Sequence, residues 1–240
     1  MTTRQRPPRR AVVVHEVLQL TPRTVRIVAT GELTGWEPAG PGAHFKVFLP
    51  HGGDERVMRT YSVRRYDPAA GELTVDFVLH GSGPAADWAR SAEPGDRFEV
   101  SGRARSGFVP DGWCVLAGDQ AALPAIAAIA ESAPAAARLL ALVEVPDAGE
   151  ELKLESPSGL SVQWLHRDGQ PACEPLVSAI ERLELPPGDG QVWVGCEAQA
   201  MRRIRRHLLE DRGLSPGSLH TRAYWRMGVA DYPDHDTGEE

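Results

Sequence analysis

The sequence changes its pattern once, near residue 105, and this change restricts the chain to a fold with two different halves. Before it, short runs rich in β-branched residues alternate with turn clusters such as Gly40-Pro41-Gly42 and Gly52-Gly53-Asp54. After it, short apolar runs alternate with helical segments, a pattern typical of a parallel sheet with covering helices. We therefore predict two domains, residues 1–105 and 106–240, which meet in the Gly/Arg/Ser segment 102–107.

The first half predicts a small antiparallel β-barrel. Its short strands and regular turns, with almost no helix between them, are typical of such barrels. The expected strands are residues 11–20, 24–29, 43–49, 56–63, 73–79 and 97–101. One helix is expected at residues 84–91, because Pro84 suits the first turn of a helix.

The second half predicts a parallel α/β domain. Buried parallel strands appear as short continuous apolar runs, and several such runs are followed here by a helical pattern. The expected strands are residues 113–117, 139–144, 161–165 and 191–194, and the expected helices are 121–131, 173–185 and 198–211. The fold class is therefore a β domain followed by an α/β domain.

Charge, cysteine content and hydropathy exclude several classes of protein. A net charge of −7 disfavours nucleic acid as a partner. The three cysteines are widely spaced and show no metal-ligand spacing, so no metal site is predicted. No apolar run reaches the roughly 18 residues that span a bilayer, and residues 1–10 lack the apolar stretch of a signal peptide. We expect a cytoplasmic monomer without a membrane partner.

The segment Arg59-Thr60-Tyr61-Ser62 at the end of an expected strand is the first candidate site. Arg59 and Tyr61 are two residues apart, so they share one face of the strand. A guanidinium can form two hydrogen bonds with a phosphate, while Tyr61 can lie flat against a large aromatic ring. Ser62 would add a hydroxyl. An ordinary strand with one charged and one aromatic side chain would show the same four residues.

A second candidate site is the strand and glycine-rich turn that lead into the helix at 84–91. Free N–H groups at a helix N-terminus form an anion site, and glycine allows close approach. His80 could donate a hydrogen bond to a cofactor or be purely structural. The candidate residues are Asp76, Phe77, Val78, Leu79, His80, Gly83, Pro84 and Ala85.

Two turns of the second half also join a strand to a helix. Gly118-Asp119 opens the helix at 121–131, and Glu197 stands in the corresponding place before the helix at 198–211. Nucleotides bind at this carboxyl edge of parallel sheets. Gly118-Asp119 is not part of a G-x-G-x-x-G sequence, so a plain turn explains it equally well. Cys196 has no activating partner in the sequence, and we interpret it as structural.

Two features near the C-terminus leave alternatives open. The helix at 198–211 carries a run of arginines that is either a solvated face or a set of cations for an anionic ligand. Tyr224-Trp225-Arg226 is an aromatic pair in an otherwise polar tail, which either anchors the tail or lies near a cofactor. The arginines are Arg202, Arg203, Arg205 and Arg206.

Taken in order, these segments resemble the siderophore-interacting protein family, flavoproteins related to ferredoxin reductases. The likeness runs from about Ala11 to the acidic tail. Arg59–Ser62 is similar to the family's R-x-Y-[ST] flavin signature, and the segments 76–89, 118–124, 197–205 and 224–226 resemble its further signatures. The chain departs from the family at Gln120, Ala121, Cys196 and Ala223.

The resemblance implies an FAD-binding barrel, a domain that binds NADPH or NADH, and reduction of a ferric siderophore or other ferric chelate. The residues named above would hold the cofactors. Outer-sphere electron transfer needs no general acid or base, so no catalytic residue is predicted. Basic side chains expected near the substrate are Lys46, Arg64, Arg65, Arg103 and Arg105.

Two alternatives remain at this stage. One is a flavin reductase or ferredoxin-linked reductase on the same fold, with a different electron acceptor. The other is a protein that binds a siderophore or a flavin without catalysis. Poor activity on every ferric chelate with high activity on a protein acceptor would favour the first. The paired flavin motifs argue against the second, and a colourless purified protein would argue for it.

Overall fold

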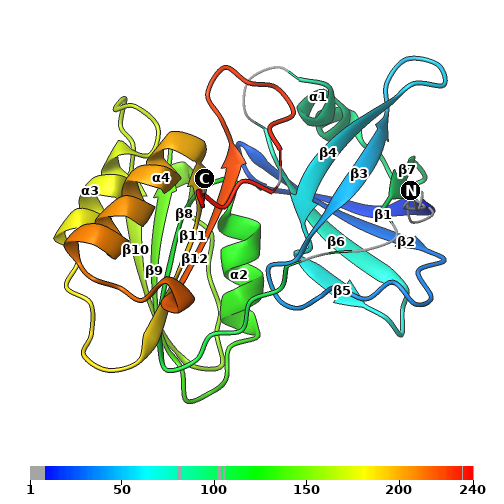
Figure 1. The fold of residues 1–240 in the computed structure, drawn as a ribbon. Helices are drawn as coiled ribbons and strands as arrows, with labels where there is room; N and C mark the ends of the chain where they lie inside the picture. Colours follow the sequence, from blue (N-terminus) through cyan, green and yellow to red (C-terminus); the bar gives the residue numbers. More distant parts are fainter. Residues whose placement is uncertain (1–8, 80–82, 102–103, 105, 234, 240) are drawn as a thin grey trace, which may run out of the picture. The chain divides into compact units, whose positions relative to one another are not determined.

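The structure is a computed structural model that describes residues 9–79, 83–101, 104, 106–233 and 235–239. The chain forms two compact units, Met1–Phe108 and Val109–Glu240 (Figure 1). No helix in these described ranges is long and apolar enough to cross a membrane.

The first unit is an antiparallel sheet of seven strands in the order β4-β3-β7-β1-β2-β6-β5. The strands are β1 (Arg10–Thr21), β2 (Thr24–Gly31), β3 (His44–Pro50), β4 (Arg56–Ser62), β5 (Arg65–Asp67), β6 (Glu72–Val78) and β7 (Arg97–Val100). Although β4 and β6 lie near opposite ends of this order, the rings of Tyr61 and Phe77 meet with centroids 4.3 Å apart. The sheet is therefore rolled around one core, as the predicted barrel requires.

The core of this unit fills the inside of the rolled sheet. Alternate residues of β6 face inward, so Leu73, Val75 and Phe77 are completely buried. Helix α1 (Pro84–Ser91) closes the core through Trp88, whose ring lies 5.6 Å from Phe77. Trp36 is also fully buried and donates its indole N–H to the carbonyl of Ser101 at 2.7 Å. This packing fixes β4 and the start of α1 on one framework.

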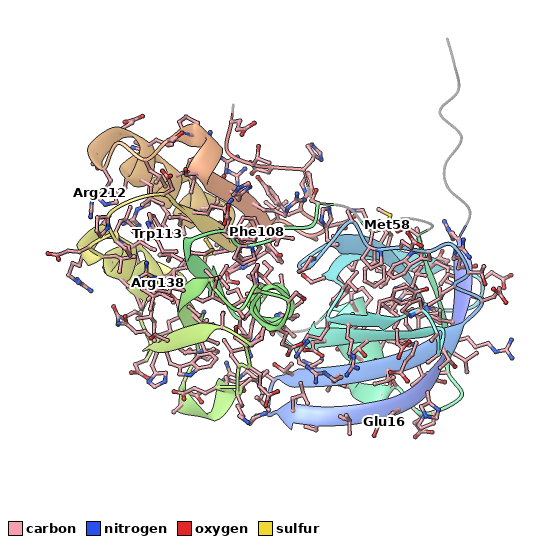
Figure 2. The ribbon with its side chains drawn as sticks, turned by 90° about the horizontal axis from the view of Figure 1, so that it is seen from below. Glu16, Met58, Phe108, Trp113, Arg138 and Arg212 are labelled. Carbon is pink, nitrogen blue, oxygen red and sulfur yellow. The ribbon has the colours of Figure 1, made fainter. Side chains whose placement is uncertain are left out.

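The second unit is a parallel sheet of five strands in the order β10-β9-β8-β11-β12. The strands are β8 (Trp113–Asp119), β9 (Arg138–Val145), β10 (Gly159–His166), β11 (Gly190–Glu197) and β12 (Leu219–Trp225). Helix α2 (Leu123–Glu131) covers one face, while α3 (Glu174–Arg182) and α4 (Ala198–Arg206) cover the other (Figure 1). Trp113 and Arg138 are partners at the amino ends of β8 and β9 (Figure 2).

The strand order of this sheet reverses between β8 and β11. From β8 the chain moves outward through β9 to β10, and it then returns to build β11 and β12 on the other side. At such a reversal the connections leave the edge in opposite directions, which opens a crevice at the carboxyl ends of the two strands. Asp119 ends β8 and Glu197 ends β11, so both residues lie at the carboxyl ends of the strands between which the order reverses.

The prediction of a polar tail at the C-terminus is wrong for Tyr224 and Trp225. They belong to β12, which pairs with β11 along its length. Burial alternates along β12, with Leu219, Thr221 and Ala223 facing inward. A small residue and a threonine on the inward face made this strand look polar in the sequence.

The boundaries of three expected helices also differ from the prediction. Helix α2 begins at Leu123, two residues late, and α3 ends at Arg182, three residues early. Helix α4 ends at Arg206, and its last turn continues as a π-helical turn, His207–Asp211.

Candidate functional site

Arg59 and Tyr61 lie on the same face of β4. Their partners on β3 are Val47 and Phe45, and both of these side chains are buried, which places the pair on the inward face. Tyr61 packs against Phe77 with the two rings tilted by 41°. Burial raises the pKa of the Tyr61 hydroxyl, and the nearby positive charge of Arg59 acts in the opposite direction. The aromatic ring and the guanidinium are therefore neighbours.

Thr60 faces the other way, together with Lys46. The two are direct partners across β3 and β4, and the Lys46 ammonium donates to the Thr60 hydroxyl at 2.6 Å. Ser62, which ends β4, is buried. Because alternate residues of a strand face opposite sides, the sheet separates Lys46 from Arg59 and Tyr61.

The start of α1 supplies backbone donors. Gly83 precedes the helix in an extended conformation and, as a glycine, contributes no side-chain cap. A Cβ placed at Gly83 would meet no atom within 4 Å among the described residues. Pro84 and the buried Ala85 form the first turn. Residues 80–82, His80 among them, lie outside the described part of the chain.

Asp76 forms an ion pair between neighbouring strands of the first sheet. Its carboxylate receives two hydrogen bonds from Arg26, the directly opposite residue on β2, at 2.7 and 2.8 Å. Arg64 approaches the same carboxylate at 3.8 Å. Asp76 is 4% exposed and points away from the face that carries Phe77. Asp76 is thus held in a structural ion pair, and its contact with a cofactor stays a prediction.

The other residues of this expected segment fall into two groups. Phe77 is fully buried in the core, and Leu79 is 8% exposed, so neither presents a free side chain. Val78 is half-buried at the end of β6. The segment therefore acts as a support for the start of α1.

The described basic residues expected near a substrate differ in their exposure, with Arg64 largely covered and Arg65 exposed. The Arg64 side chain is 12% exposed and lies 3.8 Å from the Asp76 carboxylate. Arg65 begins β5 and is exposed. Arg103 and Arg105 lie outside the described residues.

In the second unit, Asp119 is a buried carboxylate at the end of β8. It accepts hydrogen bonds from the Trp225 indole at 2.7 Å, from the backbone of Ala121 at 2.9 Å and from the Cys173 thiol at 3.5 Å. Burial raises the pKa of the Asp119 carboxyl, although these hydrogen bonds oppose the effect. The carboxylate therefore has its main partners inside the chain.

Trp225 reaches Asp119 from the other side of β11. It ends β12, yet its indole bonds to Asp119 on β8, so the ring passes over the end of β11. The pairing with β11 slips at this point: Ala223 pairs with Cys196 but Trp225 with Glu197, which leaves Tyr224 as the extra residue of a bulge. Bulges change the direction of a side chain at a strand end.

Two glycines allow the close packing of side chains and strands around Trp225. A Cβ at Gly195 would lie 2.7 Å from the rings of both Trp193 and Tyr224, which pack edge to face. A Cβ at Gly118 would lie 2.6 Å from the carbonyl of Gly195. Gly118 is therefore needed for the close packing of β8 on β11, whatever binds at the edge.

Glu197 and the arginines of α4 also have internal partners. Glu197 caps α4 by accepting from Gln199 and Ala200, and its other oxygen accepts from Met227. Arg226 and Val229 form an isolated antiparallel β-bridge. Three of the four arginines form ion pairs, which favours the solvated-face interpretation: Arg202 with Asp236, Arg203 with Glu174 and Arg205 with Glu239.

Sequence reasoning missed Glu144, the next-to-last residue of β9 and the strand partner of Asp119. It is 2% exposed and accepts hydrogen bonds from the backbone of Cys173 at 2.7 Å and of Leu176 at 3.2 Å. These bonds fix the start of α3, and burial raises the pKa of the Glu144 carboxyl. A single acid at the end of the apolar run Leu139–Val143 was the available signal.

The raised pKa of Asp119 predicts a pH-dependent stability. The folded protein holds this proton more tightly than the unfolded chain, whose reference pKa is 3.8. Asp119 thus contributes stability below that pH, which is lost as pH rises through the folded-state pKa. Asp119→Asn should flatten this fall in the free energy of unfolding, measured by urea unfolding at several pH values. Parallel curves for the variant and the wild type would contradict the assignment, and exposed Asp111→Asn is the control.

Comparison with known proteins adds relatives over the whole chain. The family model for the siderophore-interacting FAD-binding domain matches residues 51–106, and that for siderophore-interacting protein matches residues 111–228. Ferric vibriobactin reductase ViuB of Vibrio cholerae is 30% identical over 236 residues, which cover 88% of this chain and 87% of that protein.

Solved structures agree with this relationship. A siderophore utilization protein from T. fusca has 35% identity and a TM-score of 0.84, with 97% of this chain and 98% of that chain covered. A ferredoxin NADP⁺ reductase from Neisseria gonorrhoeae with bound FAD and NADP shares the fold at 16% identity, with a TM-score of 0.68 over 92% and 99% of the two chains. The chain belongs to the siderophore-interacting protein family.

Proposed function

We propose that this protein is an FAD-containing reductase that uses NADPH or NADH to reduce a ferric siderophore and so release the iron as Fe(II). The observation that carries the proposal is the pairing of Arg59 with Tyr61 on one face of β4, in a unit that matches the family's FAD-binding domain. The relative ViuB, a ferric vibriobactin reductase, supports the choice of substrate.

The residues at β4 and α1 fit FAD in their chemistry. The Arg59 guanidinium would bind a flavin phosphate, and the neighbouring Tyr61 ring would lie against an aromatic part of the cofactor. A second phosphate has a place at the start of α1, where Gly83 brings no side chain and the backbone N–H groups of a helix N-terminus favour an anion. Two phosphate sites suit a dinucleotide and exceed what FMN needs.

The carboxyl edge of the second unit fits a nicotinamide cofactor. Its strand order reverses between β8 and β11, the position at which nucleotide-binding sheets hold their ligand, and Trp225 lies there. The Asp119 hydrogen bond holds the indole in place. Asp119 and Glu197 both accept hydrogen bonds from the protein's own N–H groups. Neither is assigned a role as proton donor, because outer-sphere electron transfer needs none.

The iron chemistry requires little from the side chains. Bound FAD supplies a site that takes two electrons as hydride and releases them one at a time. Siderophores hold iron through hard oxygen donors, which bind Fe(III) more strongly than Fe(II). Reduction of the iron therefore loosens its complex. The protein needs to bind and orient the two redox partners and to leave a path for electrons.

Cofactor analysis tests the binding part of this proposal. The purified protein should be yellow, and mass spectrometry of the released cofactor should identify FAD. Recovery of FMN alone would show that the second phosphate site at α1 has been assigned wrongly. A colourless protein that does not take up FAD would contradict the proposal itself.

The exposed Arg65 predicts a salt effect on the iron substrate. A cation beside the flavin segment raises the local concentration of an anionic chelate, and salt screens this attraction. Arg65→Ala should therefore reduce the salt dependence of the reduction rate for an anionic ferric chelate and leave a neutral chelate unaffected. Equal salt dependence in variant and wild type would remove Arg65 from the substrate site.

A further inference from the structure

The chain turns back after β12 and covers the outer edge of that strand (Figure 1). In the order of the second sheet, β12 has β11 on one side only. On the other side the backbone N–H of Ala223 donates to the carbonyl of Asp236 at 2.9 Å. The Thr221 hydroxyl donates to the carbonyl of Thr237 at 2.6 Å. We call the returning segment the strap, and its described residues are Tyr232, Pro233 and residues 235–239.

Asp236 is the residue that fixes the strap to α4. Its side chain is 10% exposed, and its carboxylate accepts hydrogen bonds from the Arg202 guanidinium at 2.7 Å and from the Tyr232 hydroxyl at 2.5 Å. Its other oxygen accepts from the backbone of Gly238 at 3.0 Å. Burial acts to raise the pKa of Asp236, but these hydrogen bonds and the Arg202 charge outweigh it and hold the pKa below its usual value. The carboxylate is therefore ionised at neutral pH.

The strap also fits this surface in shape and backbone conformation. Tyr232 packs against the core of the second unit, and Glu239 lies 3.9 Å from Arg205 of α4. Gly238 has a φ of +74°, and a Cβ placed there would lie 3.1 Å from atoms of both Met201 and Arg205. A side chain at Gly238 would therefore be strained and would push the strap away from α4. Charge, packing and a glycine conformation thus all fit the strap to one position.

The strap covers a strand edge that could otherwise pair with another chain. The edge of a sheet presents unpaired N–H and C=O groups, and proteins protect such edges with prolines, charges or a covering loop. β12 contains no proline. Because Ala223 directs its N–H toward the strap, Leu219 and Thr221 direct their backbone groups to the same side. Without the strap, β12 would offer these three residues for pairing.

A second copy of β12 has the geometry to pair with this edge. Two β12 strands that run antiparallel about a twofold axis at Thr221 would place Leu219 of one copy opposite Ala223 of the other. Arg222 would lie opposite His220, and burial lowers the pKa of His220, so two positive charges do not meet at neutral pH. The pairing would satisfy the outward backbone groups of both copies.

We propose that the strap is an intramolecular cover that keeps β12 from pairing with β12 of a second copy, and that the ion pair of Asp236 with Arg202 holds the cover closed. The family match of the second unit ends at residue 228, so the strap lies outside the matched residues. The cover acts independently of cofactor binding and of iron reduction. Its release exposes an association surface at the edge of the second sheet.

Light scattering coupled to size-exclusion chromatography measures this association. The purified wild type should have the mass of one chain at every concentration. Asp236→Ala should release the strap, and its mass should rise toward that of two chains as the protein concentration is raised. Asp236→Ala/Ala223→Pro should remain a monomer, because proline has no N–H to donate at the strand edge. Glu210→Ala removes an exposed carboxylate of the same unit and is the control that should behave as the wild type.

Hydrogen exchange of the wild type tests the closed strap without any variant. The Ala223 amide should be protected, and in dilute, monomeric Asp236→Ala it should exchange about tenfold faster or more, because local opening sets the exchange rate. Circular dichroism confirms the fold of each variant. A folded Asp236→Ala variant that stays a monomer, or a dimer that persists with Ala223→Pro, would overturn the proposal. An unprotected Ala223 amide in the wild type would overturn it as well.

Discussion

Replacement of Arg59 by alanine should weaken FAD binding by about 1.5–3 kcal/mol, the range for hydrogen bonds to a charged group. This corresponds to roughly tenfold or more in affinity. The loss is expected because Arg59 lies beside Tyr61 and carries the charge that would neutralise a flavin phosphate. Titration of the apoprotein with FAD, followed by the quenching of flavin fluorescence, measures the change.

Arg56→Ala is the control for this variant. Arg56 belongs to the same strand and is exposed, but it lies three residues away and so faces the opposite side from Arg59. It should keep wild-type affinity. If Arg59→Ala binds FAD as well as the wild type does, the β4 segment is an ordinary strand and the flavin site lies elsewhere.

Replacement of Asp76 by alanine should destabilise the first unit by about 3 kcal/mol, the lower end of the range for breaking a buried ion pair. The carboxylate is 2% exposed, and its removal leaves Arg26 and Arg64 without their shared partner in partly buried positions. Urea unfolding, followed by circular dichroism, should show a lower transition midpoint. Flavin affinity per folded molecule should remain near that of the wild type.

Asp87→Ala separates burial from the mere presence of an ion pair. Asp87 bonds to Arg90 at 2.7 Å, but the two side chains are 61% and 41% exposed. Such a surface pair contributes about 1 kcal/mol or less. An equally small effect for Asp76→Ala, combined with a large loss of flavin affinity, would restore Asp76 to the cofactor site.

The local signals of the sequence predicted the two fold classes and most of the strands and helices. Pro84 after a glycine-rich turn predicted a helix at 84–91, and the structure places α1 at the same residues. Runs of β-branched residues between turns predicted the antiparallel strands, because strand formation depends on the alternation within each run. The short β5 was missed, since three residues carry no periodicity.

Hydrogen-bond partners that are distant in the sequence could not be predicted from such local signals. Arg26 and Asp76 are 50 residues apart, and only the pairing of β2 with β6 brings them together. Trp225 and Asp119 are 106 residues apart and meet across β11. The sequence identifies a charged or aromatic residue at a strand end, but tertiary contacts decide whether its partner is a ligand or another side chain.

Stepwise anaerobic reduction tests the central claim most directly. The purified yellow protein is titrated with NADPH or NADH without oxygen until the flavin absorption is bleached, and a ferric siderophore is then added with a colorimetric ferrous chelator present. We predict bleaching by a nicotinamide, followed by return of the oxidised flavin spectrum with about two Fe(II) formed per flavin, because the flavin releases its two electrons singly. A flavin that neither nicotinamide reduces, or one that stays reduced in the presence of every ferric chelate, would contradict the account.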